Sequence, residues 1–411
     1  MKNSLYLKSV LLLFITLFIS SCERDDVPAK IQGEYLSDYK LISSYTQQQV
    51  KDKLILASFA FPDFEKLISS SDYGVSVYRI LYNTSLLGEN IIASGLVCIP
   101  QSEGTFPFAS FQNGTNTCNS NAPSQNPSDQ FYSLISVMAG SGYILTIPDY
   151  IGFGESEYIL HPYHHKQSSN ASVIDLVLAA KELVNSSVSE ANNNNDIYLL
   201  GYSQGGWATL SILRELELNS NYAFNTIAAA CGAGAYNLME MSRHVLALDV
   251  YSNPFYLPYF IESRRQNEIL ATPLSSFFKQ PYADNIPELF DGNFCISEIN
   301  KNFPQQIDSL FTSEFIASFE SGLEYSALRE ELTSNSVDIW NLQANIHFFH
   351  SKGDNSVPYK LSQNMFNSFK EEGVPNSQLS LTLIDSLDHN EAIIPWGIDA
   401  LIWLNQARKN N

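Results

Sequence analysis

A serine between two glycines is the feature of this chain most indicative of chemistry. The pentapeptide Gly-Tyr-Ser-Gln-Gly at 201–205 follows an apolar run at 197–200 and opens a stretch of helical character. In a sharp turn between a buried strand and a helix, the hydroxyl of Ser203 is lifted out of the sheet, as in a nucleophile elbow. The turn also leaves the backbone N–H of Gln204 free to stabilise an oxyanion. The pattern therefore predicts a nucleophile for acyl transfer.

A nucleophilic serine needs a base to take its proton and an acid to orient that base. Both residue types follow later strand-like runs, in the order serine, acid, histidine that is typical of parallel-sheet hydrolases. Asp354 lies in a glycine-containing loop after the run 346–349, and His389 lies in a loop after the run 379–384. We therefore predict a catalytic triad of Ser203, Asp354 and His389.

Neighbouring acids and histidines fit these roles less well. Asp385 and Asp388 are too close in sequence to His389 to be its usual orienting acid. His347 and His350 lie in or at the end of a predicted strand, where we expect a role in the core or in support of the site.

The second oxyanion donor is expected in the loop after the strand-like run 108–111. That loop reads Asn113, Gly114, Thr115. Gly114 lets the backbone approach the substrate, and the Thr115 N–H is the predicted donor beside that of Gln204.

Two further loops are expected to shape the cleft. The glycine-rich loop 148–156 follows the next strand, and Asp149 is predicted to brace it rather than to react. Its G-x-G pattern lacks the third glycine and helix start of a dinucleotide site. The histidine-rich run 161–165 has no carboxylate at ligand spacing, so the chain is predicted to use neither a metal nor another cofactor.

The elements that must position these residues alternate along the chain. Two runs, 75–82 and 91–99, predict an antiparallel hairpin, and the later alternation of strand and helix predicts a mostly parallel sheet with helices on both faces. One of these helices is expected near 170–185, capped by Ser168 or Ser169. Between Ala230 and Asn345 the alternation stops, and a proline- and aromatic-rich segment predicts a mainly helical cap. The expected organisation is a signal peptide at 1–21, a linker and helical arm at 22–72, an α/β core at 73–231 and 341–411, and the cap at 232–340.

The charge of the chain argues against nucleic-acid partners. The sequence has 43 acidic and 23 basic residues, a formal charge of −20. Such a surface repels phosphate backbones. Most cap aromatics are expected to form a local core, while a few face the cleft and favour esters with an apolar acyl part.

The N-terminus reads as an export signal. Two lysines precede an apolar run at 10–19 that is too short to span a membrane comfortably. The run ends at Cys22 in a sequence that resembles a bacterial lipobox, in which this cysteine carries lipid. We expect an exported protein anchored to a bacterial membrane, with the outer membrane as the expected one and a surface-exposed location left open; a cleaved signal with a chance cysteine is the alternative. The oligomeric state is left undetermined.

Four cysteines remain if Cys22 is lipidated. Cys98 lies in an apolar strand and is expected to be a buried thiol. A disulfide between Cys118 and either Cys295 or Cys231 fits an exported chain, and the sequence leaves both pairings open.

Together, these motifs resemble the α/β-hydrolase superfamily, and within it the secretory-lipase-like branch. The resemblance covers about residues 73–411, except for the cap. It implies hydrolysis of a small-molecule, lipid or glycan ester through an acyl-enzyme on Ser203. Many relatives carry His-Gly where this chain has Asn113 and Gly114. The alternatives are a serine peptidase of the prolyl-oligopeptidase kind, which usually carries a propeller absent here, and a non-catalytic binding lipoprotein on the same scaffold.

Overall fold

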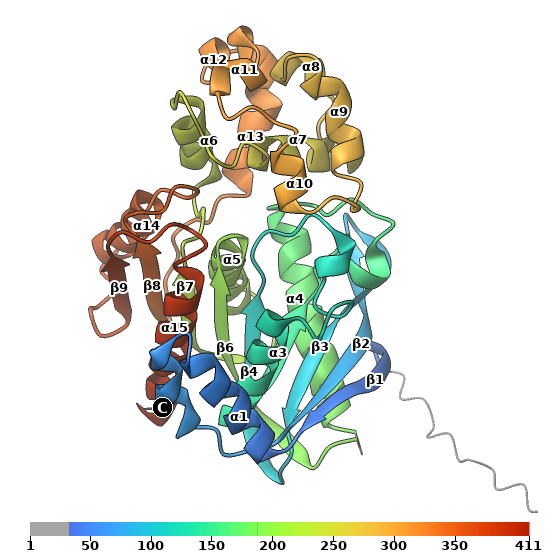
Figure 1. Cartoon of the computed structure of the whole chain (residues 1–411), viewed down its shortest axis with the longest axis vertical. Helices are drawn as coiled ribbons and strands as arrows, with labels where there is room; N and C mark the ends of the chain where they lie inside the picture. Colours follow the sequence, from blue (N-terminus) through green and yellow to red (C-terminus); the bar gives the residue numbers. More distant parts are fainter. Residues whose placement is uncertain (1–32, 187, 411) are drawn as a thin grey trace, which may run out of the picture. The chain divides into compact units, whose positions relative to one another are not determined.

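A nine-stranded sheet runs through the protein (Figure 1). The structure, a computed structural model, describes residues 33–186 and 188–410. The strand order is β1-β2-β3-β5-β4-β6-β7-β8-β9. All pairs from β5 to β9 in this order are parallel, whereas β1, β2 and β3 are antiparallel to their neighbours. The prediction of a mostly parallel sheet is thus confirmed. Its strands are β1 (Leu36–Tyr45), β2 (Val75–Leu86), β3 (Glu89–Pro100), β4 (Gly104–Gln112), β5 (Ile144–Pro148), β6 (Ala191–Tyr202), β7 (Asn225–Gly232), β8 (Asn345–Ser351) and β9 (Leu379–Ile384).

Helices cover both faces of the sheet, as the alternating pattern predicts. On β6, Tyr198 and Leu200 pack in the same hydrophobic cluster as α1, α3 and α15. The intervening Ile197 and Leu199 face α4 and α5 instead. Because successive side chains of a strand point to opposite faces, a strand buried on both faces needs an unbroken apolar run. The core helices are α1 (Gln47–Ser58), α2 (Glu65–Ile68), α3 (Gln130–Val137), α4 (Lys166–Val184), α5 (Gln204–Leu218), α14 (Lys360–Glu371) and α15 (Ile393–Asn410).

The N-terminal arm differs from the helical prediction. Leu41 and Ile42, which fit the helical prediction for the arm, lie in β1, and within the described part of the arm, residues 33–72, the α-helices are 47–58 and 65–68. β1 pairs with β2 over its whole length, with Lys40 opposite Arg79. The backbone hydrogen bonds between β1 and β2 stabilise the strand more than the weak helical spacing of apolar residues would stabilise a helix.

Helix α4 also starts earlier than its sequence suggests. It begins at Lys166, and its cap is His165, not Ser168 or Ser169. The ring nitrogen of His165 accepts from the Ser168 N–H. An imidazole acceptor thus replaces the hydroxyl that capping preferences favour.

The helices between β7 and β8 form the segment predicted as a cap, and Figure 1 shows them grouped together. Most of their aromatics pack in one cluster, with Phe255 and Phe277 fully buried. Tyr251, Tyr256 and Phe260 line a cavity beside Ser203, as expected for an apolar underside. These helices are α6 (Leu238–Leu246), α7 (Tyr256–Gln266), α8 (Leu274–Phe277), α9 (Tyr282–Leu289), α10 (Ile296–Asn300), α11 (Ile307–Leu310), α12 (Ser313–Ser318) and α13 (Ser326–Ser334).

The predicted signal peptide and Cys22 lie outside the described residues. Within 33–186 and 188–410, none of the helices combines the length and hydropathy that a bilayer crossing requires.

Candidate active site

Ser203 stands in the turn between β6 and α5, where the sequence places the nucleophile. Its backbone angles are φ 60° and ψ −123°, a conformation that an L-residue adopts only when its surroundings hold it. Both flanking glycines are needed for this turn. A Cβ on Gly205 would lie 2.0 Å from the carbonyl oxygen of Gln112, and one on Gly201 would lie 2.3 Å from that of Gly205. The tight turn therefore aims Ser203 from the carboxyl end of β6.

The three predicted catalytic side chains form one hydrogen-bonded chain. His389 Nε2 lies 2.8 Å from Ser203 Oγ, and His389 Nδ1 lies 2.6 Å from Asp354 Oδ2. A carboxylate only accepts hydrogen bonds, so Nδ1 carries the imidazole proton and Nε2 accepts from the serine hydroxyl. The Tyr202 hydroxyl donates to the carbonyl oxygen of His389 at 2.8 Å and fixes the loop. This arrangement provides a nucleophile, a base and an orienting acid.

Asp354 is buried but ionised. Burial raises the pKa of this carboxyl, but hydrogen bonds from His350 and His389 outweigh it, so the pKa lies well below its usual value. Its other oxygen accepts the backbone N–H groups of Ser356 and Val357, each at 2.8 Å. The negative charge therefore persists at neutral pH, where it can stabilise an imidazolium.

His350 supports Asp354 from behind. Its Nε2 lies 3.1 Å from Asp354 Oδ2 and 2.9 Å from the Val357 carbonyl oxygen, so this nitrogen carries the proton. Its Nδ1 lies 2.7 Å from Ser362 Oγ on α14, which donates in return. His350 is a positioning residue, whose imidazole holds the acid of the hydrogen-bonded chain. The sequence allowed either a core role or a supporting role for His350. It could not distinguish them, because the contact with Ser362 depends on how α14 packs against β8.

Backbone donors lie next to the nucleophile. A Cβ on Gly114 would lie 3.8 Å from the Ser203 Cβ, so the loop after β4 runs alongside the serine. Gln204 is the first residue of α5, and its N–H has no intrahelical acceptor. Thr115 is held by a 3.0 Å contact between its hydroxyl and that of Tyr163. The structure thus brings together the residues predicted for an oxyanion hole.

Asn113 and Asp149 brace the two loops around this region. Asn113 Nδ2 donates to the Pro148 carbonyl oxygen at 2.5 Å, which supplies side-chain support where many relatives have histidine. Asp149 accepts from the hydroxyls of Ser94 and Ser124, both at 2.5 Å. Burial raises the pKa of Asp149, and these hydroxyls partly offset that rise. Its predicted bracing role matches these contacts.

His161 packs locally, as preferred for the histidine-rich run. Its Nδ1 lies 2.6 Å from the Ile151 carbonyl oxygen and its Nε2 lies 2.9 Å from Gln204 Nε2. Nδ1 therefore donates, and Nε2 accepts from the amide of the residue after the nucleophile. Burial is the main cause that lowers the pKa of His161 to about 4. The part of the chain that the structure describes contains no cluster of His, Cys, Asp and Glu that could hold a metal ion.

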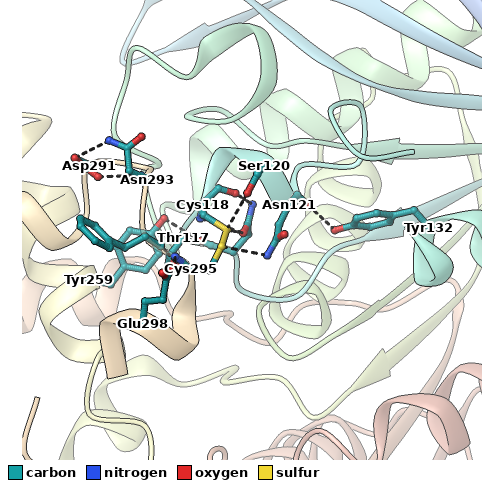
Figure 2. The surroundings of a disulfide bond; sticks show 12 residues. Thr117, Cys118, Ser120, Asn121, Tyr132, Tyr259, Asp291, Asn293, Cys295 and Glu298 are labelled. Carbon is teal, nitrogen blue, oxygen red and sulfur yellow. Dashed lines mark hydrogen bonds between the residues drawn. A yellow bond between two sulfur atoms is a disulfide. The ribbon is translucent and has the colours of Figure 1, made fainter. Parts of the chain in front are cut away.

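A disulfide joins the loop after the oxyanion region to the segment before α10 (Figure 2). Cys118 pairs with Cys295, and Cys231 is a buried free thiol like Cys98. Thr117 Oγ1 also donates to a backbone carbonyl of this cap segment at 2.9 Å. The disulfide therefore links one wall of the site covalently to the cap segment. Of the two pairings that the sequence left open for Cys118, the structure has the one with Cys295.

The rival acids and the second histidine face elsewhere. Asp385 pairs with Lys352 at 2.9 Å, and Asp388 accepts the backbone N–H groups of Asn390 and Glu391. His347 Nε2 lies 2.6 Å from the carboxylate of Asp399 on α15. These contacts keep all three side chains occupied away from the serine.

Known proteins share both the fold and part of the sequence. The family model of the secretory lipases matches residues 129–253. A proposed hydrolase from Legionella pneumophila is 27% identical, with a TM-score of 0.81 over 91% of this chain and 98% of that one. The rice cell wall degrading esterase LipA from Xanthomonas oryzae is 22% identical, with a TM-score of 0.76 over 92% and 98%. Candida antarctica lipase A in its closed state is 16% identical, with a TM-score of 0.62 over 90% and 82%. No curated protein sequence matches.

The fold and the arrangement of the site define an α/β hydrolase. The match over 129–253 adds that this part of the chain resembles the secretory lipases.

Proposed function

We propose that this protein is an exported serine esterase that works through an acyl-enzyme. The observation that carries the proposal is the unbroken hydrogen-bonded chain from Ser203 through His389 to Asp354. It ends on a strained serine at a strand end, next to two candidate backbone donors. Removing an oxyanion donor or a triad member typically lowers kcat by orders of magnitude. The presence of all these groups at one place therefore supports an acyl-transfer function.

In the first half-reaction the ester carbon is attacked by Ser203 Oγ, whose proton passes to His389 Nε2. The carbonyl oxygen becomes an oxyanion, which the N–H groups of Gln204 and Thr115 stabilise. When the tetrahedral intermediate collapses, the bond to the alcohol oxygen breaks and that oxygen takes the proton from His389. Water then attacks the acyl-enzyme by the same route, with His389 again as base, and releases the acid.

The test is loss of turnover in Ser203→Ala with p-nitrophenyl butyrate. We expect kcat to fall by about 10⁶-fold while the circular dichroism spectrum is unchanged. Ser211→Ala is the matched control, because Ser211 is a buried serine on α5, the helix that follows Ser203, and its hydroxyl donates to Asn170. A fluorophosphonate probe should label wild type and Ser211→Ala, and should spare Ser203→Ala. Turnover of Ser203→Ala near that of wild type would refute the mechanism.

An Xaa-Pro amide substrate separates an esterase from a peptidase. We expect no measurable cleavage of the amide under conditions that hydrolyse the butyrate ester. Preferred cleavage of the amide would replace the esterase by the peptidase alternative.

We further propose that Cys22 carries the lipid that anchors the exported protein to a bacterial membrane. The proposal rests on the apolar run and small residues before Cys22, and the likeness to secretory lipases favours export. In cells fed labelled palmitate, wild type should incorporate label and sediment with membranes, and Cys22→Ala should do neither. Labelling that persists in Cys22→Ala would contradict the anchor.

A further inference from the structure

Ser203 lies between two cavities that differ in size and chemistry. The first, which we name the apolar pocket, has a volume of about 60 Å³. Its walls include Leu238, Met241, Leu257 and Phe260 from the cap helices. The second, which we name the polar cleft, has a volume of about 310 Å³. Loops of the core form most of it. Its polar lining includes Asn113, Asn121, Asn126, Asp129, Tyr132 and Asn390, and Phe111, Phe131, Ile296 and Ile393 also line it.

The position of His389 decides which half of an ester enters which cavity. His389 lines the polar cleft and does not line the apolar pocket. In ester cleavage the imidazolium must reach the oxygen of the departing alcohol, since it gives that oxygen its proton. The alcohol half therefore lies in the polar cleft, and the acyl half extends from Ser203 into the apolar pocket.

The apolar pocket has room for a short acyl chain only. A cavity needs about 10–15 Å³ to hold one water-sized group, so 60 Å³ accommodates about four to six carbon-sized groups. Its lining is mostly aliphatic and aromatic, with Met241 and Phe260 among its walls. This volume fits acetyl to about hexanoyl groups better than the long chains of storage fats.

The polar cleft presents hydrogen-bonding groups without positive charge. The amides of Asn121, Asn126 and Asn390 line it, and neither Lys nor Arg does. These amides supply donors and acceptors that suit an alcohol with several hydroxyl groups, and Asp129 adds a carboxylate to the same lining.

Aromatic side chains complete this cleft. Tyr132 lies in it beside Asn121, to whose carbonyl oxygen its hydroxyl donates at 3.2 Å. Aromatic faces carry negative charge density and attract the polarised C–H faces of sugar rings. Asp129 and the charge of −20 disfavour anionic alcohols. The combination indicates a neutral polyol.

We propose that the natural substrates are short-chain acyl esters of neutral, polyhydroxylated alcohols such as sugars. The acyl chain occupies the apolar pocket and the polyol occupies the polar cleft beside His389. This inference rests on the proposed function, because it names the substrate of the same serine.

The experiment compares esters that change one half at a time. Glucose monobutyrate and hexyl butyrate share the acyl group and have alcohols of six carbons, but only glucose carries further hydroxyls. Glucose monododecanoate keeps the alcohol and lengthens the acyl chain. We expect kcat/KM for glucose monobutyrate to exceed that for each of the other two by at least about tenfold.

The outcomes separate this inference from the proposed function. No hydrolysis of p-nitrophenyl butyrate would refute the esterase itself. Hydrolysis of that ester with equal or higher kcat/KM for hexyl butyrate would refute the polyol site. Equal or higher kcat/KM for the dodecanoate would refute the short acyl pocket. A preference for butyrylcholine would also refute the inference, since it would make Asp129 and the aromatics a cation site.

Variants of the cleft link the preference to its residues. The double variant Asn126→Leu/Asn390→Leu should lower the ratio of kcat/KM between glucose monobutyrate and hexyl butyrate by about tenfold. Asn376→Leu is the matched control, because Asn376 is exposed and does not line the cleft, and it should leave the ratio unchanged. Met241→Ala should enlarge the apolar pocket and raise kcat/KM for the hexanoyl relative to the butyryl ester. Unchanged ratios in both variants would overturn the assignment of the two cavities.

Discussion

The core and the cap segment contribute to the same cavity in different ways. In the core, Ser203, Asp354 and His389 stand at strand ends, and each is held by specific hydrogen bonds. In the cap, side chains such as Leu257 and Phe260 line the apolar pocket. What matters there is the volume and the polarity of the pocket. Chemistry depends on placement within about half an ångström, whereas an apolar wall tolerates exchange of similar side chains. In the proposed function, the reaction therefore depends on the core, and in the proposed substrate assignment the cap selects the acyl chain.

The largest expected effect tests the core. Asp354→Asn should lower kcat for p-nitrophenyl butyrate by about 10⁴-fold, because an amide cannot hold the imidazole in the required tautomer or stabilise its charge. The effect should be the same for every ester, whichever acyl chain the cap admits. Asp385→Asn removes a carboxylate from the next loop, which pairs only with Lys352, and should leave kcat within twofold of wild type. A loss below tenfold in Asp354→Asn would show that the acid is elsewhere.

The next effect tests how the cap is attached to the core. Arg264 on α7 is fully buried and donates to Glu331 and to the carbonyl oxygens of Tyr163 and His164. Arg264→Met leaves these acceptors unpaired, and should lower the free energy of unfolding by about 3–5 kcal/mol in urea titrations.

Arg243→Met is the control for that variant. Arg243 is an exposed cap arginine that pairs with Glu320 at 2.6 Å, and its loss should cost at most about 1 kcal/mol. Equal losses in the two variants would contradict a buried link between cap and core.

A third prediction concerns the pH dependence of stability and His161, which lies in the core loop before α4. Burial lowers the pKa of His161 to about 4, from about 6.5 in an unfolded chain. The folded state therefore binds fewer protons than the unfolded state between these values. The free energy of unfolding is therefore unaffected by this histidine above pH 6.5, where it is neutral in both states. It falls by on the order of 3 kcal/mol as the pH drops from 6.5 to 4, because the unfolded state takes up the proton first.

His161→Gln should reduce the slope of unfolding free energy against pH in this window. It should not abolish that slope, because burial also lowers the pKa of His164 and His165. His244→Gln, at an exposed position on α6, should change the slope far less. A slope unchanged by His161→Gln would refute a buried neutral histidine there.

The smallest effect refines the core. His350→Gln removes the imidazole behind Asp354 and should lower kcat by about tenfold, the value of one hydrogen bond, with KM little changed. His347→Gln is the matched control on the same strand, because His347 contacts Asp399 and Ser380 instead. It should leave kcat unchanged even if it lowers stability. A change confined to KM in His350→Gln would argue against a positioning role.

Much of the core could be predicted because its signals are local. The elbow at 201–205 needs glycines wherever it occurs, since any Cβ there would meet backbone atoms. The order of Ser203, Asp354 and His389 follows strand-like runs that are readable one at a time. The hairpin of β2 and β3 was predictable for the same reason.

Other features depend on contacts between distant segments. β1 is a strand because β2 offers it an edge, and α4 starts early because an imidazole caps it. Cys118 and Cys295 are 177 residues apart, so only the packing of α10 selects this pairing. The contact of His161 with Gln204 joins a loop to the first residue of α5 and leaves no pattern in either segment.

The α/β architecture and the candidate nucleophile, acid and base could be predicted from the sequence, because turn chemistry and strand periodicity act over a few residues. The disulfide, the contact of His350 with Asp354 and the two cavities around Ser203 depend on packing between distant segments. A cavity is the space left after helices from distant parts of the chain have packed, and its volume and lining are therefore absent from any local pattern.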